Sequence, residues 1–277
     1  MTNNILSLES YVTLHNGVKM PIVGFGTWKI LPNSKAQRVV SSALSTGYRY
    51  IDTARIYLNE KGVGAAINDS GIARDKIFVS TKLWNSDQGS EKPKKAFDRS
   101  LKRLGLDYVD LYLLHWPVTD KRLESWKALE DIYKSGRAKA IGVCNFTEEH
   151  LAELLNNCEI APMVNQVEFH PFLYQKMLLE YCNEHNIHVE AYSPLAHGRR
   201  MQDKTIMEIA NKYSKSTAQI MLRWNIQLGN IVIPKSTSRE RIEENIDIFD
   251  FEIDKKDMDR IENLNENLRT CWDPTGM

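Results

Sequence analysis

The sequence predicts a single (β/α)8, or TIM, barrel domain over residues 1–277, with a β-hairpin at its N-terminus. Three observations lead to this prediction. The length of 277 residues is one that such barrels commonly use as one domain. Eight short β-branched or aromatic runs alternate with amphipathic segments along the chain. No Pro-, Ser- or Gly-rich linker divides the chain into two domains.

The hairpin is expected over residues 11–21. The segments YVTLH and VKMP flank the pair Asn16-Gly17. Because Asn-Gly favours positive φ angles at both central positions, a type I′ turn is predicted.

The later apolar runs have the features of parallel strands between helices. VDLYLL and IVI are continuous rather than alternating, as expected for strands that are covered on both faces. In contrast, apolar residues in KAFDRSLKRLGL recur every three to four positions, which is typical of a helix. Strands are expected within residues 21–26, 47–52, 76–82, 108–116, 139–145, 163–169, 188–194 and 230–236, and helices within 34–47, 58–71, 92–105, 123–136 and 147–158.

Two glycine-rich stretches do not form a dinucleotide-binding fingerprint. GFGTWK lacks the third glycine at the required spacing, and GVGAAI at residues 62–67 lies inside a predicted helix. Both stretches are interpreted as sites of close packing.

The composition excludes several classes of protein. Hydrophobic residues make up 42% and charged residues 26%, and 36 basic residues balance 36 acidic ones, so no overall charge favours nucleic acid or a membrane surface. MTNNILSLES has no signal-peptide pattern and no later run is long enough to span a bilayer, so a cytoplasmic protein is expected. The four cysteines show no C-x-x-C spacing, and reduced thiols are expected.

Polar residues end nearly all of the predicted strands. Barrel enzymes build their active sites from the carboxyl ends of the strands, so these residues are the candidates for function. Taken singly, each has a structural explanation as a helix cap, an ion pair, a packed aromatic or a core histidine. Gathering several ionisable groups in one place costs free energy, which favours a functional site. The candidates are Asp52 with Tyr57, Lys82, His115, Asn145, Gln166, Glu168, Tyr192, Ser193, Lys235, Ser236 and Thr237.

The first four candidates suit proton transfer to a carbonyl. A phenol is a poor acid at neutral pH, but a nearby ammonium favours the phenolate, so Lys82 is expected to lower the pKa of Tyr57. Asp52 would keep Lys82 charged, and His115 would position a substrate oxygen. This arrangement describes general acid catalysis on an oxygen that becomes an alkoxide.

None of these side chains transfers hydride, so a cofactor is required. Asn145 and Gln166 offer amide groups for a carboxamide, and Tyr192 offers a flat face for stacking. IPKSTSRERIEEN places several hydroxyl and basic groups around a helix start, which suits the 2′-phosphate of NADPH, although a solvated basic helix start is the alternative. Those groups belong to Lys235, Ser236, Thr237 and Arg241.

The sequence resembles the aldo-keto reductase family over nearly its whole length. The resemblance is carried by GFGTWK, GYRYIDTARIYLNEKGVGAAI, STKLWN, LGLDYVDLYLLHWP, AIGVCNF, MVNQVEFHP, EAYSPLA and IPKSTSRERIEEN. The compact microbial members, which include glyoxal, methylglyoxal and diketogluconate reductases and proteins like prostaglandin F synthase, look most similar. The combination of IDTA-x-x-Y-x-N-E, a strand-end Lys and LLHWP is highly specific.

The resemblance implies a barrel that binds NADPH and reduces small to medium aldehydes and ketones, and family habit suggests a monomer. It implies a catalytic tetrad of Asp52, Tyr57, Lys82 and His115, with Tyr57 as the acid, and no metal. The implied cofactor contacts are Thr27, Trp28, Cys144, Asn145, Gln166, Tyr192, Ser193, Leu195, Lys235, Ser236, Thr237, Arg241, Glu244 and Asn245. The implied substrate contacts are Trp28, Tyr57, Trp84, His115 and Trp116.

Some features depart from the family pattern or leave alternatives open. Cys144 stands where the family usually has serine, which leaves a weaker donor beside the carboxamide. Arg199 and Arg200 either reach the pyrophosphate or are solvated, and Trp272 either folds over the pocket or anchors the C-terminal tail. The compact loops and tail predict an open, permissive pocket.

Three other functions are alternatives for this sequence. An NADPH-binding redox sensor with negligible turnover is the main alternative, although the intact tetrad favours an enzyme. A Schiff-base aldolase would need a depressed pKa at Lys82, and pairing with Asp52 would raise it. A metal hydrolase is disfavoured because His115, His170 and His188 lie on different runs.

Overall fold

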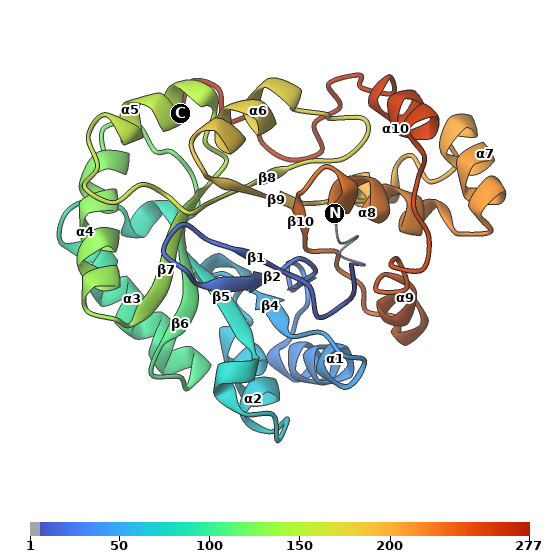
Figure 1. The fold of residues 1–277 in the computed structure, drawn as a ribbon. Helices are drawn as coiled ribbons and strands as arrows, with labels where there is room; N and C mark the ends of the chain where they lie inside the picture. The colour runs from blue at the N-terminus through green and yellow to red at the C-terminus, as the bar shows by residue number, and fades with distance from the viewer. Residues whose placement is uncertain (1–5) are drawn as a thin grey trace.

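The hairpin predicted at the N-terminus is present. The computed structural model describes residues 6–277, and in it β1 (Tyr11–Thr13) pairs in antiparallel fashion with β2 (Lys19–Pro21). The hairpin lies across one end of the barrel (Figure 1). His15 Nε2 lies 3.2 Å from Ala161 O, and His188 Nε2 lies 3.3 Å from Thr13 O. These contacts place the hairpin at the amino ends of the strands, opposite the end where the candidate residues were expected.

The turn of this hairpin is not the predicted type I′. Gly17 has a φ of +86°, but Asn16 does not adopt a positive φ. The strands are joined by a longer connection, in which Gly17 N donates to Leu14 O at 2.8 Å. The side chain of Asn16 accepts from Val18 N at 3.1 Å and donates to Lys139 O at 2.9 Å. The prediction was wrong because these side-chain contacts and the longer connection replace the two-residue turn.

Eight parallel strands form the barrel wall, in agreement with the prediction. Their order in the sheet follows the chain from β3 to β10, and every adjacent pair is parallel. Each strand overlaps a segment that was predicted to contain one, although β5 ends one residue after its segment and β7 begins one residue before its segment. The strands are β3 (Phe25–Gly26), β4 (Tyr50–Asp52), β5 (Phe78–Leu83), β6 (Val109–Leu114), β7 (Ala138–Cys144), β8 (Val164–Glu168), β9 (His188–Tyr192) and β10 (Ile231–Val232).

A short seam between the first and last strands closes the barrel. Val23 and Val232 form a parallel bridge. Gly24 N donates to Val232 O at 2.8 Å, and Gly26 N donates to Pro234 O at 3.1 Å. A Cβ at Gly24 would lie 2.3 Å from the ring of Tyr50, so the close packing predicted for this glycine-rich stretch is confirmed.

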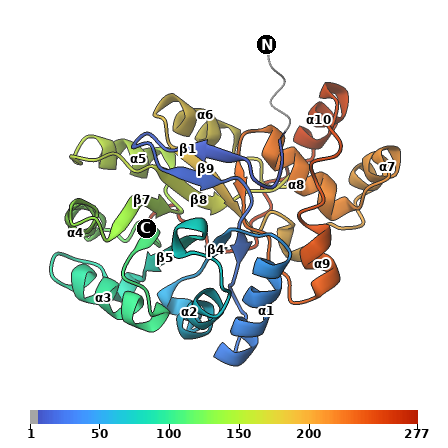
Figure 2. The same cartoon turned by 60° about the horizontal axis from the view of Figure 1, so that its bottom comes forward.

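Helices surround the strands on the outside (Figures 1 and 2). The five predicted helices are present, and a Cβ at Gly64 of α2 would lie 1.9 Å from Leu104 O of α3, which confirms close packing at GVGAAI. No helix among residues 6–277 combines the length and the hydropathy needed to cross a membrane. The helices are α1 (Asn33–Ser45), α2 (Glu60–Asn68), α3 (Lys92–Leu104), α4 (Arg122–Lys134), α5 (Glu148–Leu155), α6 (Lys176–Glu184), α7 (Lys204–Tyr213), α8 (Thr217–Gln227), α9 (Arg239–Glu244) and α10 (Lys255–Glu262).

The core lies on both faces of the sheet. Leu111, Tyr112, Leu113 and Leu114 of β6 are all buried, so this strand meets side chains inside the barrel and helices outside it. This double burial explains why its sequence is continuously apolar from Leu111 to Leu114. Each fully buried aliphatic side chain contributes about 1.5–3 kcal/mol, and the wall therefore forms a rigid support for the residues at its carboxyl end.

Candidate active site

The structure brings the four candidate catalytic residues together. Asp52 is the last residue of β4, Lys82 lies near the end of β5, and His115 follows β6 directly. Tyr57 ends the short 3-10 helix η1 (Arg55–Tyr57) that follows β4. Lys82 Nζ lies 2.5 Å from Asp52 Oδ1 and 5.1 Å from the centroid of the Tyr57 ring. The Tyr57 and His115 rings are 5.8 Å apart, edge to face.

Lys82 and Asp52 form a buried ion pair that further hydrogen bonds support. Their side chains are 0% and 2% exposed. Asp52 Oδ1 also accepts from Ser80 Oγ at 2.7 Å and from Gln166 Nε2 at 3.1 Å, while Lys82 Nζ also donates to Thr53 O at 2.9 Å. Burial lowers the pKa of Lys82, but Asp52, Tyr57 and Cys144 together raise it by more, so the pKa lies above its ordinary value. Lys82 is therefore a fixed ammonium.

The predicted lowering of the Tyr57 pKa is wrong in its net direction. Burial raises the pKa of Tyr57 above its ordinary value of 10, and the charge of Lys82 lowers it only in part, while Asp52 raises it again. Loss of solvation outweighs one nearby ammonium because the phenolate would be buried with a carboxylate also close. At neutral pH the phenol consequently keeps its proton, which is the state that a proton donor requires.

His115 is a neutral imidazole. Burial and the charge of Lys82 hold the pKa of His115 well below its ordinary value. Its Nδ1 is buried and has no hydrogen-bond partner among residues 6–277. The ring packs edge to face against Trp84 with centroids 5.1 Å apart. A neutral imidazole can hydrogen-bond to a ligand oxygen without adding positive charge beside Lys82.

A second buried carboxylate, Glu190 of β9, was missed from the sequence. It accepts from Tyr50 OH at 2.5 Å and from Gln166 Nε2 at 2.9 Å. Gln166 thus bridges Glu190 and Asp52, and Tyr50 OH, 3.0 Å from Ser80 Oγ, makes a second bridge. Burial and the charge of Asp52 raise the pKa of Glu190 to about 7. A charged residue inside the otherwise buried strand HVEAY was the signal that could have identified it.

The amide and aromatic groups of the late strands join the same cluster. Asn145 Nδ2 donates to His115 O at 3.0 Å, and Tyr192 OH donates to Asn145 Oδ1 at 2.8 Å. Because the amide nitrogen of Gln166 donates to Asp52 and Glu190, its amide oxygen is the group left for a further partner. Cys144, at the end of β7, is 1% exposed.

The predicted aromatic residues lie around the mouth of this site. Trp28 is 40% exposed, and its ring centroid is 5.4 Å from that of His197. Trp272 of the C-terminal tail lies against Trp116 and Trp84, with centroids 5.5 and 6.5 Å apart. Because the Trp272 side chain is 60% exposed, it covers these two walls rather than anchoring the tail by burial.

Several predicted cofactor contacts lie elsewhere at the same end of the barrel. Lys235 follows β10. Its Cβ lies 3.8 Å from the position that a Cβ on Gly26, the neighbour of Thr27, would occupy. Burial and the charges of Lys35 and Lys29 lower the pKa of Lys235, so three ammonium groups approach one another there. The other predicted contacts follow β9 or β10 or belong to α9 and its C-cap, namely Ser193, Leu195, Ser236, Thr237, Arg241, Glu244 and Asn245.

Some predicted residues already have partners within the protein. Thr27 is fully buried and its hydroxyl donates to Asp52 O at 2.9 Å. Arg200 pairs with Glu266 at 2.7 Å, whereas Arg199 is exposed. Among residues 6–277, no group of three His, Cys, Asp or Glu side chains is arranged to hold a metal ion.

Comparison with known proteins identifies the family of the chain. The model of the aldo/keto reductase family matches residues 22–266. The chain is 52% identical over 268 residues to glyoxal reductase of Bacillus subtilis (strain 168), covering 97% of each chain. The crystal structure of an aldo/keto reductase from Brucella melitensis is 51% identical with a TM-score of 0.90, covering 92% of this chain and 99% of that one.

A further solved structure includes a cofactor. The crystal structure of a Bombyx mori aldo-keto reductase in complex with NADP is 37% identical to this chain, with a TM-score of 0.90 and 95% of each chain covered. The family model and these identities confirm the resemblance that was stated from the sequence motifs. The chain belongs to the aldo/keto reductase family.

Proposed function

We propose that this protein uses NADPH to reduce small to medium aldehydes and ketones to alcohols. The observation that carries the proposal is the buried ammonium of Lys82, which lies 2.5 Å from Asp52 Oδ1 and 5.1 Å from the Tyr57 ring. This geometry gives a proton-donating phenol a fixed positive charge beside it. Reduction of a carbonyl needs such an acid.

The residues present fit NADPH. The ammonium groups of Lys29, Lys35 and Lys235 approach one another closely enough to perturb the pKa of Lys235, and bound phosphate would offset this repulsion. At the other end of the cofactor, the amide oxygen of Gln166 is suited to accept from a carboxamide. The Bombyx mori relative in complex with NADP supports the same cofactor here.

When bound, the nicotinamide supplies the hydride. Tyr57 gives its proton to the substrate oxygen, and the phenolate that remains is stabilised by Lys82. Asp52 holds Lys82 in place and charged. The neutral imidazole of His115, whose ring centroid lies 5.8 Å from that of Tyr57, orients the substrate oxygen toward Tyr57. The ammonium of Lys82 is thus already in place to stabilise the negative charge that forms on Tyr57 when it gives up its proton.

The substrate class is inferred from the mouth of the site and from the relatives. Four tryptophans lie around it, of which Trp28 and Trp272 are exposed to solvent. An open aromatic mouth suits carbonyl compounds of varied shape. The 52% identity to glyoxal reductase supports small dicarbonyls as one group of substrates.

The test follows oxidation of NADPH by its near-ultraviolet absorbance with a panel of aldehydes, for the wild type and Tyr57→Phe. The variant should lose about 10²–10⁴-fold in kcat/KM, the usual contribution of a general acid. The exposed Tyr11→Phe variant serves as the matched control and should retain activity. Unchanged activity in Tyr57→Phe would reject the proposed acid. NADPH binding by fluorescence without turnover of any carbonyl would favour the sensor.

A further inference from the structure

A buried carboxylate holds the C-terminal segment of residues 268–273, called the strap below, whose first residue also donates from Leu268 N to Phe172 O at 2.9 Å. Glu168, the last residue of β8, is 1% exposed. Its carboxylate accepts from Thr270 N at 2.8 Å, from Cys271 N at 3.1 Å and from the Thr270 hydroxyl. His170 Nε2 lies 3.3 Å from Oε1, the same oxygen that accepts from Thr270. Backbone N–H groups that donate to a buried carboxylate make strong, directional contacts.

The inner side of the strap faces the aromatic mouth of the proposed active site. Trp272, the second residue after Thr270, lies against Trp116 and Trp84. Cys271 Sγ lies 3.9 Å from His197 Nε2, and the His197 ring in turn lies beside Trp28. The strap therefore connects two sides of the mouth.

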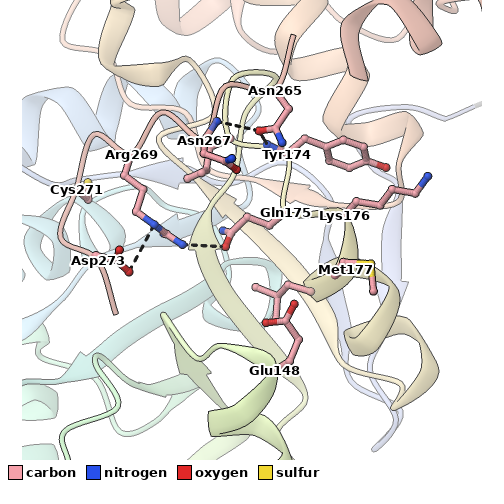
Figure 3. Close-up of a pocket in the computed structure, with 12 residues that line it drawn as sticks. Glu148, Tyr174, Gln175, Lys176, Met177, Asn265, Asn267, Arg269, Cys271 and Asp273 are labelled. Atoms are coloured by element: carbon pink, nitrogen blue, oxygen red, sulfur yellow. Dashed lines mark hydrogen bonds and ion pairs between the residues drawn. The ribbon is translucent and has the colours of Figure 1, made fainter. Parts of the chain in front are cut away.

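The outer side of the strap lines a separate open cavity of about 720 Å³ (Figure 3). Arg269 points toward Gln175 and Asp273 in this view, with its guanidinium 3.3 Å from Gln175 Oε1 and 3.7 Å from Asp273 Oδ1. Gln175 Nε2 donates to Glu168 O at 2.7 Å. The same residue of β8 thus holds the strap from the inside through its carboxylate and from the outside through its backbone.

From this geometry we infer that Glu168 is a positioning residue that latches the strap, so that Trp272 completes the aromatic wall of the substrate pocket. Within residues 6–277, Glu168 makes no hydrogen bond to any of the four candidate catalytic residues. It therefore acts through the strap. The inference rests on the proposed function for the identity of the pocket. Holding Trp272 in place favours aromatic carbonyl substrates, because a preformed wall needs no ordering when the substrate binds.

A glutamine at position 168 would break the latch without changing its size. Its single carbonyl oxygen can still accept, but its NH2 group would face the N–H groups of Thr270 and Cys271. Thr270→Val is a milder variant, because it removes only the hydroxyl donor and keeps both backbone donors. Glu180→Gln changes an exposed carboxylate on α6 and is the matched control.

The first measurement is limited trypsin digestion of the full chain, read by intact mass. Cleavage after Arg269 releases residues 270–277 and reports directly on release of the strap. Glu168→Gln should be cut about tenfold faster than the wild type and Thr270→Val about threefold faster, since the rate follows the population of the open form. Glu180→Gln should match the wild type.

The second measurement compares KM and kcat for glyoxal and for a bulky aromatic aldehyde. In Glu168→Gln the KM for the aromatic aldehyde should rise about fivefold, with kcat and the KM for glyoxal within about twofold. Wild-type rates of strap cleavage in both variants, with circular dichroism confirming that they fold, would overturn the latch. Faster cleavage with unchanged KM values would overturn the role in specificity. If no carbonyl is reduced by the wild type, the proposed function fails, but the cleavage data still decide whether the latch exists.

Discussion

Glu168 and Glu190 are two buried glutamates on neighbouring strands, and their environments differ sharply. Glu168, at the mouth, accepts from two backbone N–H groups, the Thr270 hydroxyl and His170, and these hydrogen bonds keep its pKa below its ordinary value although burial raises it. Glu190, in the barrel interior, accepts from Tyr50 and Gln166 and faces Asp52, and its pKa is raised to about 7. Burial raises the pKa of both groups, but four hydrogen bonds outweigh it at Glu168, whereas at Glu190 burial and the charge of Asp52 outweigh two hydrogen bonds.

The largest expected effect comes from removing the cation of the interior network. Lys82→Met leaves Asp52 buried without its ion-pair partner and near Glu190, which should lower the free energy of unfolding by roughly 3–5 kcal/mol. Urea unfolding at pH 7 measures it. The exposed pair of Lys94 and Asp131 provides a control, and Lys94→Met should change stability little. Glu168 does not contact Lys82, so folded Lys82→Met should keep its strap protected from trypsin. Faster cleavage of the strap in this variant would show that the interior network and the mouth are coupled.

The next effect separates the two glutamates by their response to pH. A folded-state pKa raised from 4.5 to about 7 means that the stability associated with Glu190 is present below pH 4.5 and is lost as the pH rises to about 7. This corresponds to roughly 3 kcal/mol. Glu190→Gln should therefore lose less stability than the wild type between pH 5 and pH 8 in urea unfolding experiments.

Glu168→Gln provides the matched comparison for that measurement. Because the pKa of Glu168 is lowered, its stabilising contribution is present above the ordinary carboxyl range and is lost only as the pH falls through the folded value. The decrease in the free energy of unfolding between pH 5 and pH 8 should thus be smaller in Glu190→Gln but unchanged in Glu168→Gln. Equal slopes in all three proteins would show that Glu190 does not titrate in this range.

The smallest effect is expected at Cys144, which faces the interior network. Cys144→Ser introduces a stronger hydrogen-bond donor beside the proposed carboxamide site. We expect NADPH to bind tighter by about 0.5–1 kcal/mol, or roughly two- to fivefold in Kd. Fluorescence titration measures the Kd for NADPH. An unchanged Kd would contradict a contact between residue 144 and the carboxamide. Strap cleavage should not change.

Features that depend on local sequence were predictable. The apolar runs located all eight strands because strands buried on both faces are continuously apolar, as in β6. The rule that barrel sites lie at the carboxyl ends of the strands then placed Asp52, Lys82 and His115 together. Their catalytic roles stay predictions until the variants are measured.

Features that depend on distant contacts were not predictable. Thr270 and Cys271 contact Glu168 across a separation of more than a hundred residues, and no periodic pattern records such a pairing. The turn at Asn16 was misassigned because its side chain bonds to Lys139 O. The net pKa shift of Tyr57 was also wrong, since the extent of burial is a property of the folded site.

The seam of the barrel has a consequence for synthesis of the chain. β3 lies near the start and finds its second neighbour only when β10, at Ile231–Val232, has been translated. During elongation on the ribosome the outer edge of β3 therefore stays unpaired while most of the polypeptide emerges. Nascent chains with open edges associate with one another, so premature termination before β10 should yield insoluble product even though seven of the eight strands have been made.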